Sequence, residues 1–223
     1  GRPWAVIRVI VVSCSPHYGL FVPQHASVKL PPFLAQSALT GFVMSLKIAV
    51  FYGSTTCYTE MTAEKIQAML AIDPALPPSC SVTLHNLKQQ PLAAMADYDV
   101  LILGISTWDF GELQEDWEAH WDDISTVDLS GKIVAIYGMG DQLGYAEWFV
   151  DASGMLHQAI SDQTCQRIGF WSTEGYDFIR SKAVTEDGEW FYGLALDEEN
   201  QYDLTDQRLN DWLTQLMNEL IAL

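Results

Sequence analysis

The sequence has few basic residues, few cysteines and no long apolar run. Its 223 residues contain 11 Lys and Arg against 29 Asp and Glu, a net charge of −18 at pH 7. A surface this acidic repels nucleic acid and anionic membranes; it favours basic partners, or it serves solubility alone. The apolar stretch near the N-terminus is interrupted by Arg8 and is too short to span a bilayer. We therefore expect neither a nucleic-acid-binding protein nor a membrane protein.

Cysteine pairs are also lacking. The four cysteines form no C-x-x-C motif, and the five histidines are not spaced to complete a metal site with them. These absences argue against a zinc site and against a disulfide scaffold. Reduced thiols are typical of a cytoplasmic protein, which is our expectation.

Residues 1–43 differ from the rest of the chain because they contain no acidic residue. Five prolines interrupt the segment, which shows no sustained helical or strand period and no persuasive export-cleavage site. We interpret it as an artefactual or disordered extension ahead of a domain spanning 44–223. A flexible leader and a poor export signal are the alternatives. Met44 directly precedes the first clear strand.

From Met44 onward, strand and helix patterns alternate. Apolar runs predict strands at 46–53, 98–105 and 132–138, an alternating pattern predicts one at 81–87, and residues 165–171 are expected to start a fifth strand. Helical patterns are expected at 59–71, 113–123 and 145–160, and from Thr205 onward with that residue as the N-cap. This alternation predicts an α/β fold, a three-layer, open, doubly wound five-stranded parallel sheet. In such sheets ligands bind beyond the carboxyl ends of the strands.

The loop after the first strand is rich in hydroxyl side chains. It reads STTCYT (54–59) and opens a helix. Helix N-termini offer free N–H groups and partial positive charge, and hydroxyls add donors without adding charge. Because the loop has no lysine or arginine and no Walker A spacing, it suits a phosphate monoester held by neutral donors. An ordinary Ser/Thr-rich helix cap is the alternative.

Two further loops carry aromatic residues and glycines. After the third strand, GISTWDFGELQEDW places Trp108 at the ligand edge, as a lid over a flat ring or as a packing residue. After the fourth strand, GMGDQLGYAEWF places Tyr145 in a glycine-rich loop whose G-x-G-x-x-x-G spacing is not a dinucleotide fingerprint. Such glycines let the backbone approach a ligand closely. The three loops together predict a site for a flat ring carrying one phosphate, a mononucleotide such as FMN.

Residues 46–222 resemble a long-chain flavodoxin. The family's phosphate loop reads [ST]-x-T-G-x-T, and here Cys57 replaces the glycine. The runs TWDFGELQEDW and GDQLGYAEWFVDA match the two flavin loops, and LALDEENQYDLTDQR matches the segment after the long-chain insertion. The Cys-Tyr variant and the W-D-F-G run look like the second flavodoxins of enteric bacteria. The resemblance implies the family's strand order 2-1-3-4-5, with the insertion in strand five and FMN at the switch point.

The resemblance also implies the cofactor-binding residues. The phosphate loop consists of Ser54, Thr55, Thr56, Cys57, Tyr58 and Thr59. The ring is flanked by Thr107 and Trp108 and, on its other face, by Tyr145. The resemblance implies that the carbonyl of the Asp109–Phe110 peptide turns toward flavin N5 on one-electron reduction. Gly111, the next residue, is also expected to belong to the site. The pyrimidine edge is lined by Gly138, Met139, Gly140, Asp141 and Gly144.

Cys57 is the departure from the family pattern. Either the backbone there avoids a positive φ, or the residue bears modest strain. We interpret Cys57 as a tolerated small residue whose sulfur is open to oxidation, and not as a nucleophile.

Finally, the resemblance implies a function. A flavodoxin is a low-potential one-electron carrier and not an enzyme, because its FMN carries the chemistry and nearby acids disfavour the fully reduced anion. The expected donor is an NADPH-dependent flavodoxin/ferredoxin reductase, the acceptors are basic-surfaced redox enzymes, and the chain is a monomer. Alternatives are a flavodoxin-like NAD(P)H:quinone oxidoreductase and a flavin-free interaction module. The insertion, expected at 172–190 with a turn at 186–189, is either a surface embellishment or a partner-docking element.

Overall fold

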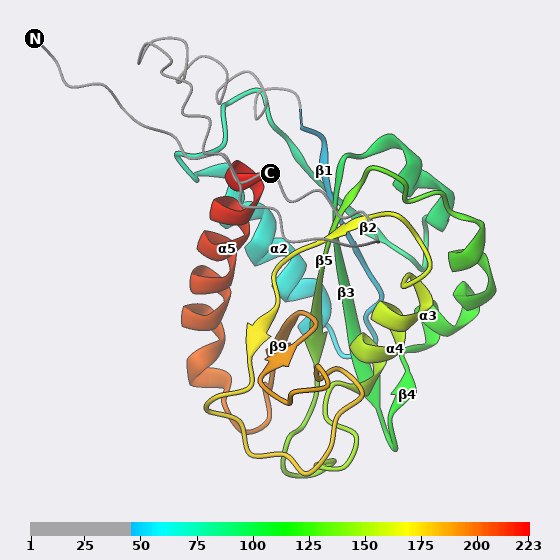
Figure 1. Ribbon diagram of the computed structural model, residues 1–223, viewed down its shortest axis with the longest axis vertical. Helices are drawn as coiled ribbons and strands as arrows, with labels where there is room; N and C mark the ends of the chain where they lie inside the picture. The colour runs from blue at the N-terminus through cyan, green and yellow to red at the C-terminus, as the bar shows by residue number, and fades with distance from the viewer. Residues whose placement is uncertain (1–45) are drawn as a thin grey trace, which may run out of the picture. The chain divides into compact units, whose positions relative to one another are not determined.

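The computed structural model describes residues 46–223, so the extension expected at 1–43 lies outside the described residues. Strands and helices alternate along the chain (Figure 1). The strands are β1 (Ile48–Tyr52), β2 (Val82–Asn86), β3 (Val100–Trp108), β4 (Glu112–Leu113), β5 (Ile133–Met139), β6 (Gln166–Arg167), β7 (Trp171–Ser172), β8 (Trp190–Phe191) and β9 (Leu194–Leu196). The α-helices are α2 (Tyr58–Ala71), α3 (Glu115–Ala119), α4 (Asp151–Ala159) and α5 (Thr205–Ala222). Short 3₁₀ helices are η1 (Leu92–Asp97), η2 (Trp121–Thr126) and η3 (Tyr202–Leu204).

The main strands of the central sheet are parallel and run in the order β2-β1-β3-β5-β6, and the short β4 pairs antiparallel with the end of β3. The fifth position of the sheet is shared by two short strands, because β6 pairs with the start of β5 and β9 pairs with its end. Ile133 thus lies opposite Gln166, and Tyr137 lies opposite Leu194. The predicted order, with an insertion interrupting the fifth strand, is confirmed.

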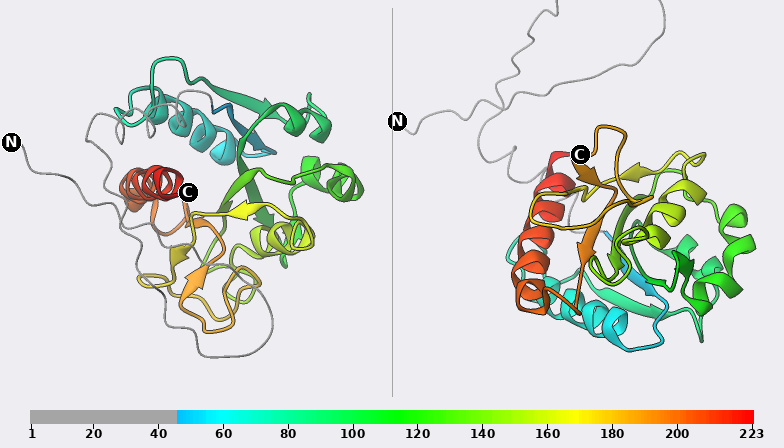
Figure 2. Two further views of the ribbon diagram at one scale, coloured as in Figure 1. Left: turned by 45° about the horizontal axis from the view of Figure 1, so that its top comes forward. Right: turned by 90° about the horizontal axis from the view of Figure 1, so that it is seen from below.

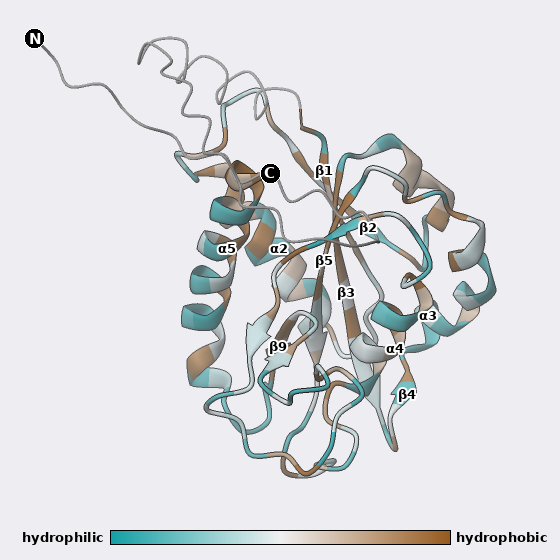
Figure 3. Cartoon of the chain, in the orientation of Figure 1, coloured by the Kyte–Doolittle hydropathy of each residue, from teal (hydrophilic) through white to brown (hydrophobic). Residues whose placement is uncertain are grey.

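Helices cover both faces of this sheet (Figure 2). On one face, Trp117 of α3 and Leu156 of α4 pack with Phe51 and Leu103 in an apolar cluster. On the other face lie α2 and α5, which contact each other and the sheet. Figure 3 shows apolar residues along the central strands and hydrophilic residues on the outward side of α5. Burial on both faces explains why the strand sequences read as continuous apolar runs.

Three helix predictions were partly wrong. The helix expected at 145–160 starts only at α4, because residues 141–150 form turns and Val150 has a left-handed φ of 49°. The helix expected at 113–123 is divided into α3 and η2 at His120. Thr205 is the first helical residue and not the N-cap, and its hydroxyl donates to Glu198.

The predicted fifth strand at 165–171 ends early, after Arg167. Gly169 has a φ of +79°, and a Cβ there would lie 2.5 Å from Leu216 Cδ2, so the chain turns away against α5. The insertion therefore occupies residues 168–193, wider than expected. It contains the antiparallel β7–β8 pair, and its turn is closed by a hydrogen bond from Gly188 N to Thr185 O. Across residues 46–223, no helix is both long and apolar enough to cross a bilayer.

Candidate functional site

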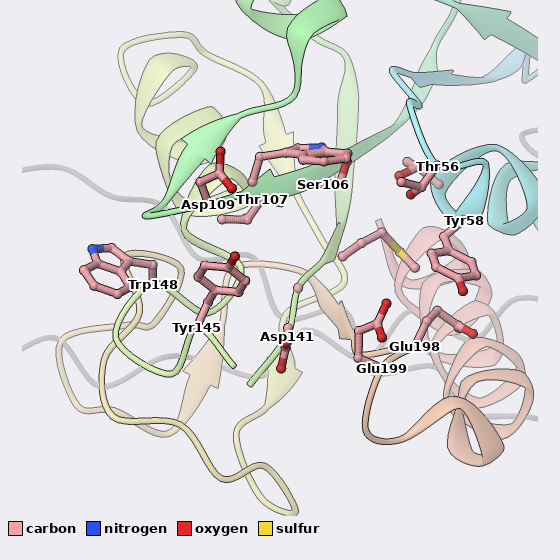
Figure 4. Close-up of a pocket in the computed structure, with 14 residues that line it drawn as sticks. Thr56, Tyr58, Ser106, Thr107, Asp109, Asp141, Tyr145, Trp148, Glu198 and Glu199 are labelled. Atoms are coloured by element: carbon pink, nitrogen blue, oxygen red, sulfur yellow. The ribbon is translucent and has the colours of Figure 1, made fainter. Parts of the chain in front are cut away.

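A cavity of about 310 Å³ opens at the carboxyl ends of the parallel strands. Segments following β1, β3, β5 and β9 meet there, as Figure 4 shows. Its wall consists of Thr56, Tyr58, Thr59, Ser106, Thr107, Trp108, Asp109, Met139, Gly140, Asp141, Tyr145, Trp148, Glu198 and Glu199. The first three of these segments were predicted from the sequence, and the one after β9 was not.

The loop after β1 brings uncharged donors to one end of the cavity. The side chains of Thr56, Tyr58 and Thr59 line the wall. Within the described part of the chain, the backbone N–H groups of residues 55–59 have no hydrogen-bonding partner, as is usual where a helix begins. These N–H groups and hydroxyls are the donors that a phosphate monoester requires.

Cys57 has a positive φ, so its backbone adopts the conformation that is strained for a residue with a Cβ. Its φ of 71° and ψ of −14° lie in the left-handed region, directly before α2. Its carbonyl accepts from Met61 N at 2.8 Å, which starts the helix. The free thiol is exposed and lies outside the cavity wall.

A buried glutamine links the first loop to the second. Gln114 has no exposed surface, and its amide nitrogen donates to Thr55 Oγ1 at 3.1 Å. Its amide oxygen accepts from the backbone of Asp116 and Trp117 at the start of α3. A Cβ at Gly53 would lie 2.0 Å from that oxygen, so only glycine fits where β1 ends. This role of Gln114 was not predicted from the sequence.

The second segment is a tight hairpin at the end of β3. Strand β3 extends to Trp108, whose indole N–H donates to Ser106 Oγ at 3.3 Å. Thr107 Oγ1 accepts from Ala152 N at the start of α4. Asp109 has a φ of 41°, and Gly111 N donates to the Trp108 carbonyl at 3.1 Å, which closes the turn.

Aromatic side chains lie at the opposite end of the cavity from the hydroxyl loop. Figure 4 shows Tyr145 and Trp148 on one side and Thr56 and Tyr58 on the other. Phe110 is 68% exposed and packs edge-on against Tyr145 and Trp148, with ring centroids 6.3 and 5.2 Å away. The cavity therefore has an aromatic end and a hydrogen-bonding end, as a ring carrying a phosphate requires.

The third segment is shaped by the carboxylate of Asp141. Its Oδ1 accepts from Leu143 N, from Gly144 N and from the side chain of Asn200, at 3.1, 2.7 and 2.8 Å. Burial raises the pKa of Asp141, but these hydrogen bonds outweigh it and leave the pKa below its usual value. Asp141 therefore stays ionised at neutral pH.

The cavity wall carries negative charge only. Its ionisable carboxylates are Asp109, Asp141, Glu198 and Glu199, and no Lys, Arg or His is among its residues. Such a wall makes adding negative charge inside the cavity unfavourable. Among residues 46–223, no group of three or more His, Cys, Asp and Glu side chains is placed to hold a metal ion.

Some predicted site residues lie outside the cavity wall. They are Ser54, Thr55, Cys57, Phe110, Gly111, Gly138 and Gly144. Ser54 Oγ accepts from Glu60 N, and a Cβ at Gly138 would lie 2.8 Å from Ser153 Oγ. Their contacts with FMN stay predictions, as do those of the residues in the wall.

Four residues of the cavity wall were not predicted from the sequence: Ser106, Trp148, Glu198 and Glu199. Trp148 was assigned to a helix that begins only at Asp151. The two glutamates follow β9, which has only three residues. A strand this short was not recognised from the sequence. Had β9 been recognised, the rule that ligands bind beyond the carboxyl ends of strands would have found them.

Known proteins match this chain over most of its length. The profile of the flavodoxin family matches residues 50–212. Flavodoxin 2 of Escherichia coli K12 is 57% identical over 175 residues, which are 78% of this chain and 97% of that protein. A flavodoxin of Nostoc sp. PCC 7120 is 47% identical over 176 residues, 79% of this chain and 98% of its own.

A solved structure matches the fold as well. The Fusobacterium nucleatum flavodoxin bound to flavin mononucleotide has a TM-score of 0.70 and 30% sequence identity, covering 78% of this chain and 98% of its own. The predicted likeness to the second flavodoxins of enteric bacteria is confirmed by the E. coli relative. The chain belongs to the flavodoxin family.

Proposed function

We propose that this chain binds FMN non-covalently and carries electrons one at a time at low potential. The observation that carries the proposal is the cavity itself, with uncharged phosphate donors at one end and aromatic side chains at the other. Membership of the flavodoxin family, whose members are electron-transfer flavoproteins rather than enzymes, supports it. The F. nucleatum relative was solved with FMN bound.

The residues of the cavity suit each part of FMN. The loop of residues 54–59 would hold the phosphate with N–H and hydroxyl donors, which explains why no cation is needed there. Trp108 and Tyr145 would flank the ring, and the backbone of Gly140 and Asp141 would face its pyrimidine edge. When bound, FMN supplies the redox chemistry, accepting one electron at a time.

The protein's contribution to the chemistry is electrostatic. Two unit charges several ångströms apart repel by about 1 kcal/mol in water and by several-fold more in a partly desolvated cavity. The carboxylates of the wall therefore oppose the last, negatively charged reduction state. This repulsion supports a low potential for the second electron.

The same acidity supports the partners we propose. Basic-surfaced proteins would be steered toward the cavity, where Phe110 is exposed beside Tyr145. We propose an NADPH-dependent flavodoxin/ferredoxin reductase as donor, basic redox enzymes as acceptors, brief contacts, and a monomeric carrier in the cytoplasm. Nucleic acid and anionic membranes are not expected as partners.

Titration of FMN into the FMN-free chain tests this proposal. We expect quenching of flavin fluorescence that saturates at one FMN per chain. Riboflavin, which lacks the phosphate, is the matched control and should bind at least about tenfold more weakly, because it leaves the donors of the loop unused. Failure to bind FMN would favour the interaction module. Steady-state NADPH oxidation without a partner would favour the quinone reductase.

A further inference from the structure

A carboxylate lies buried behind the cofactor cavity without a cation. Asp197 has no exposed surface and directly follows β9. None of the ion pairs of residues 46–223 includes it. A buried charge is tolerated only when hydrogen bonds replace its water shell, so its partners show what it holds in place.

Those partners come from two segments of the cavity wall. Oδ2 accepts from the backbone and side-chain nitrogens of Gln142, at 3.0 and 2.7 Å. Oδ1 accepts from the backbone N–H groups of Glu199 and Asn200, at 3.1 and 3.0 Å. The Asn200 amide also donates to both oxygens. One carboxylate thus ties the loop after β5 to the turn after β9.

The contacts extend from Asp197 to the cavity wall and to the insertion. The Asn200 amide donates to Asp141 Oδ1 at 2.8 Å, so it bridges two carboxylates that would otherwise repel each other. The Gln142 side-chain oxygen accepts from Asp177 N, in the insertion, at 2.6 Å. Gln142 is itself buried. Displacing Asp197 would therefore release three segments around the cavity.

We propose that Asp197 is a positioning residue of the cofactor site. The Asp197 carboxylate is required because every group that contacts its two oxygens is an N–H donor. An asparagine side chain would replace one of these oxygens with an NH2 group, whose two N–H bonds would face other donors. Through Gln142 it holds the loop of residues 140–145, and through Asn200 it orients Asp141. The inference rests on the proposed binding of FMN.

The change in FMN affinity caused by Asp197→Asn shows whether Asp197 positions the site or only repels the ligand. Asp197→Asn removes a negative charge near an anionic ligand, so repulsion alone predicts tighter FMN binding. Positioning predicts weaker binding, by about tenfold or more, because buried donors lose their acceptor. Asp203→Asn is the matched control, since it removes the same charge from an exposed residue nearby and should change the dissociation constant less than about twofold.

A second variant changes an exposed residue of the same hydrogen-bond network and leaves the buried Asp197 in place. Asn200 is exposed, so Asn200→Ala should fold even if Asp197→Asn does not. It keeps every charge but removes the donor to Asp141. We expect the pKa of Asp141 to rise and FMN binding to weaken by about threefold or more. Side-chain carboxyl NMR of the FMN-free protein measures the pKa, and flavin fluorescence measures the affinity.

The unmodified chain is titrated first. If it fails to bind FMN, the proposed function is overturned, and the pKa of Asp141 in the FMN-free protein still decides whether the network operates. If it binds FMN, weaker binding in every variant that folds, together with a raised Asp141 pKa in Asn200→Ala, supports the positioning role. Tighter or unchanged binding in Asp197→Asn, or an unchanged pKa or an unchanged affinity in Asn200→Ala, overturns it.

Discussion

Single residues at the start of α2 decide how the phosphate loop is shaped. Cys57 holds a left-handed backbone conformation that costs a residue with a Cβ about 1–2 kcal/mol and costs glycine little. The family's glycine at this position is therefore a local conformational requirement, which the loop meets here with some strain. The hydroxyls and N–H groups that face the cavity do not depend on the Cys57 side chain.

We expect Cys57→Gly to stabilise the FMN-free protein by about 0.5–1 kcal/mol, the strain relieved less the extra flexibility of the unfolded chain. Cys57→Ala keeps a Cβ in the same conformation and should stay within about 0.5 kcal/mol of the unmodified protein. Urea unfolding measures both free energies. If Cys57→Gly were less stable than Cys57→Ala by about 0.4–1 kcal/mol, the flexibility of the unfolded chain alone, the left-handed conformation would carry no strain.

At the scale of elements, α4 joins the sheet to the insertion. Its His157 stacks on Tyr192 with ring centroids 3.7 Å apart, and His157 Nε2 lies 3.2 Å from an Arg167 nitrogen. Burial, and then the charge of Arg167, lowers the pKa of His157 to about 4. The folded protein therefore requires a neutral imidazole where α4, β6 and the insertion meet.

This pKa predicts a pH dependence of stability. Because the folded pKa lies below the usual value of about 6.5, the unfolded chain takes up the proton first. Stability should be full above pH 6.5 and fall by about 3 kcal/mol as the pH drops toward 4. Comparing the free energies of unfolding of the unmodified protein and His157→Gln across this range isolates the contribution. Parallel pH profiles would contradict it.

The elements also show what a sequence can predict. The runs at 98–105 and 132–138 were recognisable because central strands of a parallel sheet are buried on both faces. The start of α4 was not, since the turns before it depend on the Asp141 carboxylate and on the left-handed Val150. Three loops of the site follow long strands and were predicted. Glu198, Glu199 and the contacts of Asp197 depend on β9, which pairs with a strand more than 50 residues away.

For the whole molecule, charge is the dominant property. All 29 acidic residues lie beyond residue 43. Summed fields of this size accelerate encounters with basic partners, and salt screens them within about 10 Å at 0.1 M. Glu112 lies opposite Trp108 of the cavity wall, and Glu115 accepts from Thr55 Oγ1, so the position of these exposed acids should matter beyond their contribution to net charge.

Charge reversal tests this. Lysine at Glu112, Glu115 and Glu118 together should slow reduction by an NADPH-dependent reductase by about tenfold at low salt, with the difference shrinking as salt rises. Lysine at Glu64, Asp162 and Asp211, exposed residues away from the cavity, gives the same net charge and should have a smaller effect. Equal rates for the two triple variants would mean that these acids do not steer the partner.

The most direct test of the proposed function is the visible spectrum of the FMN-loaded chain during stepwise anaerobic reduction. A one-electron carrier should turn from yellow to blue as the first electron enters and lose its colour only with the second, because the two potentials are well separated. Direct bleaching from yellow, with no blue stage, would contradict the account and indicate a two-electron flavoprotein.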